Sequence, residues 1–511
     1  MVINVKEFGA TADGVTLDTK AVQKAVDACA ENGSGEVVFP AGTYLLGKVI
    51  LKSNVTVTVH SGAKIVASPE LEDYPVSKGT KGSLLPHDED YDECPYDVPP
   101  YDKEHPVDTF PTNRRAAVFY ACDEENVCIR GKGVIDGNYI SVMEPYEKNV
   151  PIWADSTPDY KLYKPKGMSR PFIVYLENCE NSVIEDVLIS GASLYAVHCR
   201  RCTRLRIRGI TIKNDIGADN ADGIHLCSCT DTTVTNCDLT CGDDAIAIDG
   251  NDGKTSERVI VSECTIESRN NAIRVFTGLL TPYEYGKEYP ASCVKNITIS
   301  NCAIRQADCV ISVNADCGEV SSVRVSNIVG SLTNCGTAFL ISAHNNSKAK
   351  RISFDNWTIT SRSAGYAYAE EGSEISEVDM RGLDILVCPK TTMYGCGLKE
   401  IPKNRDGVMK DLPNYWLYHL MPYFMQLVNV KNVYLDAVRI DWGEEDLSLL
   451  NEMTSDEGKA FIQEMMELRG WPEVDVTYDW SAILVENSEN VEFGKMFLKP
   501  HGKCKETITV R

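Results

Sequence analysis

Short stretches of alternating apolar and polar residues recur along most of the chain. Each copy holds an apolar strand, a small or polar turn and a second apolar pair, as in "TRLRIRGITI", "DTTVTNCDLT" and "ERVIVSECTI". Comparable apolar positions follow one another at steps of roughly 23, 27, 27 and 38 residues, at Ile189, Ile212, Leu239, Ile266 and Ile304. A period of two and many β-branched residues predict β-strands.

A repeat of this length with no helical pattern between its strands predicts a solenoid. Leucine-rich repeats have a similar period, but their leucine signature is absent from this chain. In a parallel β-helix each coil contributes short parallel strands, and neighbouring coils lie about 4.8 Å apart. We therefore expect an all-β fold, a single-stranded right-handed parallel β-helix, with residues 1–511 forming one domain.

Four segments depart from the repeat. Residues 1–50 include "LDTKAVQKAVDACAENGSG", whose apolar spacing predicts a helix that caps the first coil. Loop insertions are expected at about 71–114 and 138–170, and a helical insertion among the C-terminal coils at about 405–480. Long loops on a rigid scaffold commonly carry function.

The charge and the cysteines restrict the possible partners and the compartment. The net charge of −23 argues against binding to nucleic acid or to anionic membranes. The 20 cysteines recur inside apolar stretches, as buried thiols do, and "MVINVKEFGA" has no signal-peptide pattern. Both features favour the cytoplasm, although a secreted protein trimmed of its signal would look the same. No metal site or cofactor is expected, and the oligomeric state is not indicated.

Aligning the coils on their apolar strands gives two columns. The uniformly apolar column, which should point inward, is Val197, Ile224, Ile246, Ile273, Ile311 and Phe339. The alternating column, which mixes polar and charged residues and should face outward, is His198, His225, Ala247, Arg274, Ser312 and Leu340.

Three aspartates stand just before two of these strands. Asp222 and Asp244 are 22 residues apart, about one coil, and Asp243 adjoins Asp244. We expect the three carboxylates to converge on an exposed face of the solenoid, where mutual repulsion raises one pKa. Glycoside hydrolysis requires a protonated carboxyl beside an ionised one. A calcium site and solvated surface acids are the alternatives.

At these residues the chain resembles glycoside hydrolase family 28, the polygalacturonase family. "NAD" from Asn220 resembles that family's "NTD" motif, and "GDD" from Gly242 matches its "GDD" motif. "FGATADG…FPAGTYLLG" and "SRPFIVYLENCENSVIEDVLISGASLYAVH" are similar as well, so that the resemblance covers roughly residues 1–360.

The resemblance implies roles for the aspartates. The family is inverting, so Asp243 would be the general acid, and Asp222 and Asp244 would position and deprotonate the water.

The family's histidine falls here at Asn271. Counted coil by coil, the arginine and lysine of its "RIK" motif fall at Ser312 and Asn314, but Arg274 occupies the arginine's column one coil earlier, so either a coil has been lost or the arginine has moved. We expect Asn271 and Arg274 to bind the substrate.

The lysine of the "RIK" motif is missing. In the family the arginine and the lysine hold a uronate carboxylate. Both a neutral sugar and a uronate held by Arg274 alone therefore stay open.

His198 and His225 stack in the outward column beside the aspartates, and we expect them to line the sugar site. A histidine ladder bonded to the backbone is the structural alternative.

The leading functional prediction is an inverting, exo-acting glycosidase for plant-type or pectin-derived oligosaccharides. A polysaccharide lyase or epimerase on the same fold and a non-catalytic carbohydrate-binding solenoid are the alternatives.

Overall fold

The structure, a computed structural model, describes most of the chain. The described residues are 1–75, 77, 116–146, 161–166, 170–251, 253–278, 291–332, 336–362, 364–388, 423–444, 481–501 and 506–511, with Asp456, Ala460 and Gln463. The chain divides into two compact units: unit 1 is Met1–Glu147, Tyr160–Arg274 and Gly278–Cys302, and unit 2 is Lys148–Asp159, Val275–Thr277 and Ala303–Arg511. A single domain over residues 1–511 stays a prediction.

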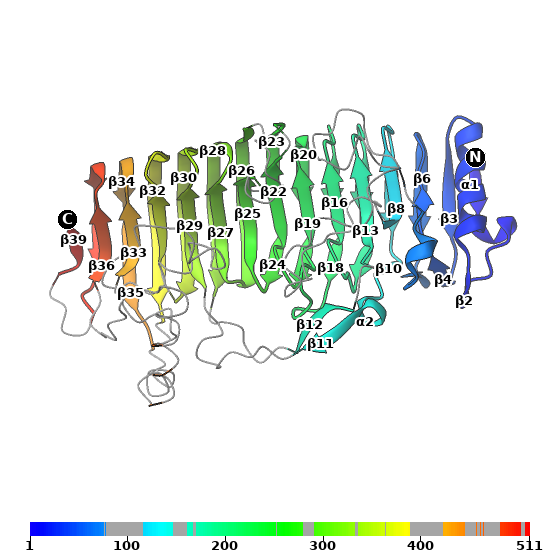
Figure 1. Ribbon diagram of the computed structural model, residues 1–511, viewed down its shortest axis with the longest axis horizontal. Coiled ribbons are helices and arrows are strands. Elements are labelled where there is room, and N and C mark those ends of the chain that lie inside the picture. The colour runs from blue at the N-terminus through cyan, green and yellow to red at the C-terminus, as the bar shows by residue number, and fades with distance from the viewer. Residues whose placement is uncertain are drawn as a thin grey trace. The chain divides into compact units, whose positions relative to one another are not determined.

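Unit 1 is a stack of short parallel strands, in which each strand pairs with its equivalent one coil further along the chain (Figure 1). One series is β5 (Val49–Ile50), β8 (Ala117–Cys122), β13 (Phe172–Glu177), β16 (Val197–Arg200), β19 (Ile224–Cys227) and β22 (Ile246–Gly250). A second is β1 (Val2–Asn4), β3 (Gly35–Phe39), β6 (Val55–Val59), β9 (Cys128–Gly131), β14 (Val183–Glu185), β17 (Arg206–Arg208), β20 (Thr230–Thr235) and β23 (Thr255–Ser262). The third is β2 (Asp13–Leu17), β4 (Gly42–Leu46), β7 (Ala63–Ala67), β10 (Val134–Asp136), β15 (Leu188–Ser190), β18 (Thr211–Lys213), β21 (Asp238–Cys241) and β24 (Thr265–Ser268).

The predicted repeat is present in the third series. Ile189 pairs with Ile212, Ile212 with Leu239, and Leu239 with Ile266, all in parallel register. All four side chains are fully buried. Burying one such side chain contributes about 1.5–3 kcal/mol, so a slip in register would cost each coil this contact. The step from Ile266 to Ile304 stays a prediction.

Asparagines at the turns tie consecutive coils together. Asn54, Asn126 and Asn181 have φ values of 62°, 56° and 53°, a left-handed conformation that asparagine tolerates well. The Nδ2 of Asn126 donates to Oδ1 of Asn54 at 2.8 Å, and the Nδ2 of Asn181 donates to Oδ1 of Asn126 at 2.6 Å. The same residue type thus shapes the turn and links it to the next coil.

The predicted N-terminal helix is present as α1 (Thr19–Glu31). It buries the four residues whose spacing predicted it, Val22, Ala25, Val26 and Cys29. It contacts η1 (Val5–Phe8), β3 and β5. Its role as a cap stays a prediction. Within the described part of the chain, no helix combines the length and the apolar character needed to cross a bilayer.

The insertion predicted at about 138–170 forms a small hairpin in its described part. Helix α2 (Tyr139–Val142) leads into β11 (Met143–Tyr146), which pairs antiparallel with β12 (Leu162–Pro165). Figure 1 shows these elements gathered at one edge of the strands of unit 1. Of the insertion predicted at about 71–114, the structure describes only residues 71–75, which include η2 (Leu71–Asp73), and residue 77. Of the helical insertion predicted at about 405–480, it describes residues 423–444, which hold three strands of unit 2, and Asp456, Ala460 and Gln463; the remaining residues lie outside the described ones.

Unit 2 is also built from parallel strands that pair coil to coil. They are β27 (Cys309–Ala315), β28 (Gly318–Ser331), β29 (Thr337–Ala343), β30 (Lys348–Ser361), β31 (Gly365–Ala369), β32 (Glu374–Val387), β33 (Tyr423–Val428), β34 (Val430–Asp436), β35 (Val438–Trp442), β36 (Ser481–Glu486), β37 (Glu489–Phe493), β38 (Met496–Leu498) and β39 (Ile508–Val510). Two further strands, β25 (Asn271–Thr277) and β26 (Ser292–Gln306), have residues in both units.

The cysteines behave as buried apolar side chains, as the sequence predicted. Every cysteine in the described part of the chain is a free thiol, and most of them are buried. They fill positions in the stacked coils that other coils fill with valine or isoleucine.

Candidate active site

The three predicted aspartates lie just before two neighbouring strands of unit 1. Asp222 precedes β19, and Asp243 and Asp244 precede β22. Ile224 pairs with Ile246 in parallel register, which places Asp222 and Asp244 at the same position of consecutive coils. The predicted adjacency of these residues is therefore confirmed.

Two glycines beside the aspartates let the coils approach closely. A Cβ at Gly223 would lie 2.3 Å from the carbonyl oxygen of Ala245, and a Cβ at Gly242 would lie 2.2 Å from that of Ala218. The Gly223 N–H donates to the carbonyl of Asp244 at 3.0 Å across the same gap. A side chain at either glycine would push the coils, and with them the carboxylates, apart.

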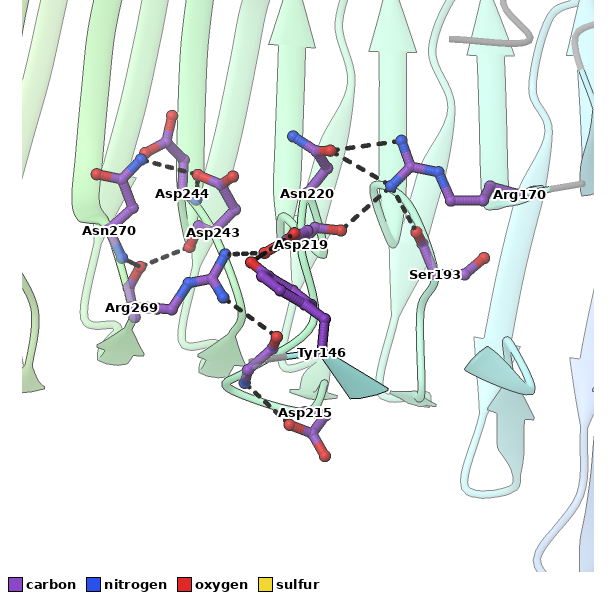
Figure 2. Close-up of polar contacts among 12 residues, drawn as sticks. Tyr146, Arg170, Ser193, Asp215, Asp219, Asn220, Asp243, Asp244, Arg269 and Asn270 are labelled. Carbon is purple, nitrogen blue, oxygen red and sulfur yellow. Dashed lines mark hydrogen bonds and ion pairs between the residues drawn. The ribbon is translucent and has the colours of Figure 1, made fainter. Parts of the chain in front are cut away.

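Asp243 is half-buried and receives only neutral donors. Its Oδ1 accepts the backbone N–H of Asp244 at 2.9 Å and the Nδ2 of Asn270 at 2.9 Å (Figure 2). Its backbone carbonyl accepts the hydroxyl of Ser268 at 2.5 Å. Oδ2 takes no hydrogen bond from any residue that the structure describes, so this oxygen can carry a proton or meet a ligand.

Asp244 is 3% exposed and has a charged neighbour. Its Oδ1 accepts the backbone N–H of Asn271 at 3.2 Å and the Nδ2 at 2.6 Å, and its Oδ2 lies 3.4 Å from Nη1 of Arg274. Burial raises the pKa of Asp244, while Arg274 opposes the rise and the charge of Asp243 adds to it. Arg274 thus faces Asp244, and its side chain, 32% exposed, is open to a ligand as well.

Asp222 is 4% exposed and lies beside His225. Its Oδ2 is 3.6 Å from Nδ1 of His225. Burial in a site poor in water, followed by the charge of Asp243, raises the pKa of Asp222 well above its usual value, and His225 partly opposes this. The sequence predicted a raised pKa for one carboxyl group. Asp222 shows this rise, and the pKa of Asp244 is raised as well.

His225 lies between two carboxylates. Its Nε2 is 3.4 Å from Oδ1 of the fully buried Asp249, and its ring stacks on Tyr195 with centroids 4.5 Å apart. Burial alone would favour the neutral ring, but Asp222 and Asp249 outweigh it and raise the pKa of His225 to about 9. His225 lies on β19 and Asp249 on β22, two strands labelled in Figure 1.

His198 lies one coil before His225 in a stack of aromatic rings. Its ring is 5.0 Å from Phe172, 4.8 Å from Tyr175 and 5.3 Å from His225, centroid to centroid. Burial, followed by the charge of His225, holds the pKa of His198 well below its usual value, so this ring is neutral. That His198 lines the sugar site stays a prediction.

The expectation that the carboxylates lie on an exposed face is wrong for Asp222 and Asp244. The alternating column does point away from the apolar column, but the rings of Phe172 and Tyr195 pack against its two histidines. Alternation along a strand gives the direction of a side chain and does not show what packs above it.

A buried arginine fixes the turn that leads to Asp222. Arg170, 3% exposed, donates from Nη1 to the carbonyls of Ser193 (3.3 Å) and Asp219 (3.2 Å) and to Oδ1 of Asn220 (3.3 Å), as Figure 2 shows. Asn220, the first residue of the "NAD" segment, is in the left-handed conformation at φ 55°. The turn before Asp222 is thereby tied to the coil before it.

A second arginine fixes the same turn from the opposite side. Arg269 donates from Nη2 to Oδ1 of Asp219 at 2.8 Å and from Nη1 to the carbonyl of Gly217 at 3.1 Å (Figure 2). The hydroxyl of Tyr146, from the hairpin strand β11, donates to the Asp219 carboxylate at 3.0 Å. Tyr163 of β12 exchanges backbone hydrogen bonds with the same turn, at Gly217 and Asp219. The hairpin therefore supports the site through this turn.

Sequence reasoning missed five residues of this group: Arg170, Asp219, Asp249, Arg269 and Asn270. Asp249 could have been found, because it lies on β22, the strand that follows the "GDD" motif, and falls in an outward register. The other four act through contacts between coils, or between a loop and a coil, that no periodicity reports.

Two side chains of the protein place positive charge beside the carboxylates. His225 faces Asp222, and Arg274 faces Asp244. Among the residues that the structure describes, no group of three or more histidine, cysteine, aspartate or glutamate side chains is placed to hold a metal ion.

Comparisons with known proteins were made on the sequence and on the fold. The sequence profile of glycosyl hydrolases family 28 matches residues 29–378. A probable polygalacturonase from Vitis vinifera is 27% identical over 246 residues, which cover 47% of this chain and 43% of that protein. An exo-poly-alpha-D-galacturonosidase from Dickeya chrysanthemi is 26% identical over 289 residues, which cover 50% of this chain and 43% of that protein. The match thus spans less than half the length of either relative.

A solved structure shows the same fold. The family 28 exopolygalacturonase from Yersinia enterocolitica superposes with a TM-score of 0.61 at 16% identity, covering 97% of this chain and 79% of that chain. The predicted right-handed parallel β-helix is thereby confirmed.

Proposed function

Because the chain belongs to glycosyl hydrolases family 28, we propose that it hydrolyses glycosidic bonds of pectin-derived oligosaccharides with Asp222, Asp243 and Asp244. The observation that carries this proposal is the difference between the surroundings of the three carboxyl groups. Asp222 and Asp244 each lie within 3.6 Å of a cation, whereas the hydrogen bonds to Asp243 come from neutral donors. Arg269, whose charge also acts on Asp243, is ion-paired with Asp219. Proton donation is therefore assigned to the carboxyl group that faces no cation at close range, and activation of water to the two that do.

Asp243 is the general acid in this mechanism. Its Oδ1 already accepts two N–H groups, so Oδ2 is the oxygen that donates the proton in this mechanism. Transfer of this proton to the glycosidic oxygen lets the bond to the anomeric carbon break without expelling an alkoxide.

Asp222 and Asp244 hold and deprotonate the attacking water. The raised pKa of Asp222 makes it a stronger base than an ordinary aspartate. Arg274 and the amide of Asn271 keep the Asp244 carboxylate in one orientation. Attack from the face opposite the leaving group inverts the anomeric configuration, and such sites keep roughly 6.5–9.5 Å between acid and base for the water.

The substrate class follows from Arg274 and from the relatives. The two relatives described above are named as a probable polygalacturonase and an exo-poly-alpha-D-galacturonosidase, which supports a galacturonate-type sugar and exo action. In the absence of the "RIK" lysine, the partly exposed guanidinium of Arg274 is the group that binds the uronate carboxylate.

Product analysis tests the proposal. Oligogalacturonides of defined length are incubated with the protein, and the first product is followed by ¹H NMR. We expect release of mono- or disaccharide from one chain end, with inverted anomeric configuration. Retention of configuration, mid-chain cleavage or an unsaturated, ultraviolet-absorbing product would each refute part of it, the last in favour of a lyase.

Replacing Arg274 by glutamine tests the substrate class. A charged hydrogen bond contributes about 1.5–3 kcal/mol, so KM for an oligogalacturonide should rise by about 10- to 150-fold. KM for the methyl-esterified oligosaccharide should change little, because that substrate has no carboxylate to lose. The matched control is Arg258→Gln, because Arg258 is an exposed arginine that is likewise paired with an aspartate, Asp231. An equal rise for both substrates would refute uronate recognition by Arg274.

A further inference from the structure

His225 has a charged group at each ring nitrogen. Its Nδ1 faces Oδ2 of Asp222 at 3.6 Å, and its Nε2 faces Oδ1 of Asp249 at 3.4 Å. The side chains of His225, Asp222 and Asp249 are 2%, 6% and 0% exposed. Water therefore screens these contacts only weakly.

This placement decides the protonation state of the ring. A neutral imidazole has one N–H and one lone pair, so one of the two carboxylates would face a lone pair. An imidazolium presents an N–H to both. A buried carboxylate without a cation is costly, and Asp249 has no described hydrogen bond to its side-chain oxygens other than its ion-pair contact with His225.

We infer that Asp249 and His225 form a buried ion pair that acts through Asp222, and that His225 is a positioning residue for the water-activating carboxylate rather than a sugar ligand. Asp249 keeps the ring charged, and the charged ring favours the ionised form of Asp222 and holds that carboxylate in place. The catalytic part of this inference rests on the proposed function. The charge state of His225 does not.

Within the part of the chain that the structure describes, the titratable side chains next to Asp222 and His225 do not supply a second cation to Asp222. The titratable side chains that face Asp222 or His225 from the neighbouring coils are Tyr195, His198, Cys241, Asp243 and Asp244. Burial and the nearby carboxylates raise the pKa values of Tyr195 and Cys241, so both stay neutral. His198 is also neutral. Asp244 adds negative charge, as does Asp243 once it has given its proton to the glycosidic oxygen, which makes the charge of His225 more important for Asp222.

The charge of His225 can be measured without any turnover. The chain has 8 histidines, so a sample labelled with ¹⁵N-histidine gives a resolvable set of ring signals. The His225 signal is assigned by its loss in His225→Gln, or by its shift in Asp249→Asn if that variant folds better. We expect this ring to stay an imidazolium at pH 7 and to titrate only near pH 9. A neutral His225 at pH 7 would overturn the inference.

The effect on Asp222 is read from the pH dependence of kcat/KM. In His225→Gln, Asp222 loses its nearest cation, so the acidic limb should move upward by about one pH unit or more. Asp249→Asn should move it in the same direction, and the double variant should add little to His225→Gln, because Asp249 acts through His225.

The matched control is His198→Gln, the same substitution one coil earlier in the same stack of rings. It should leave the acidic limb in place, whatever it does to the rate. An acidic limb that stays in place in His225→Gln, or that moves equally in both variants, would overturn the positioning role. If the protein proves to hydrolyse no oligosaccharide, the proposed function fails while the NMR titration still decides the ion pair.

Discussion

Replacing Asp243 by asparagine is expected to reduce kcat on oligogalacturonides by about 10²- to 10⁴-fold, the contribution of general acid–base catalysis. The amide oxygen of asparagine can still accept the N–H groups of Asp244 and Asn270, so the coil should keep its geometry. Only the proton for the glycosidic oxygen is lost. KM should therefore change little, as it does when an interaction made only in the transition state is removed.

The leaving group of the substrate distinguishes a loss of acid catalysis from a general loss of activity. An aryl glycoside with a nitrophenolate leaving group needs no proton, so Asp243→Asn should be far less impaired on it. Asp222→Asn, which loses the base, should be impaired on both substrates. Asp238→Asn, an exposed aspartate on β21 of the same coil, is the control for the substitution itself. An Asp243→Asn variant that keeps more than about a tenth of its kcat on oligogalacturonides would contradict the acid role.

The fold followed from the sequence because its determinants are local and repeat. Ile189, Ile212, Leu239 and Ile266 could be aligned from the sequence, and the structure pairs them in that order. A pattern of period two determines which side chains of each strand point inward. The interval between copies determines which residues lie at equivalent positions of consecutive coils. The adjacency of Asp222 and Asp244 needed nothing more than this register.

The burial and the charged neighbours of the site residues could not be predicted from the sequence, because they depend on contacts between coils. The outward position of His225 was evident from alternation, but Tyr195 and Asp249, which bury and charge it, lie on the preceding and the following coil. Arg170 reaches a turn that is about 50 residues further along the chain. Polar contacts of this kind are single and aperiodic, so a repeat pattern contains no record of them.

Replacing Gly242 by alanine is expected to damage both stability and activity. Its φ is not in the left-handed region, so the cost is steric: the new Cβ would lie 2.2 Å from the carbonyl oxygen of Ala218 and 2.7 Å from that of Asp215. Both are backbone atoms of the turn before Asp222, and no side-chain rotation relieves the contact. We expect the free energy of unfolding, measured in urea, to fall by about 1–3 kcal/mol.

The activity loss should exceed what this destabilisation explains. Moving the turn shifts Asp222 relative to Asp243, and a displacement of about 1 Å in a catalytic group can cost about 100-fold in rate. Gly33→Ala is the matched control, because Gly33 has a φ of 84° with open space around it and lies in the turn between α1 and β3. That variant should lose about 1–2 kcal/mol of stability through backbone strain and keep its kcat/KM. If both variants lost activity in proportion to stability, close packing of the two coils at Gly242 would have no specific part in placing the carboxylates.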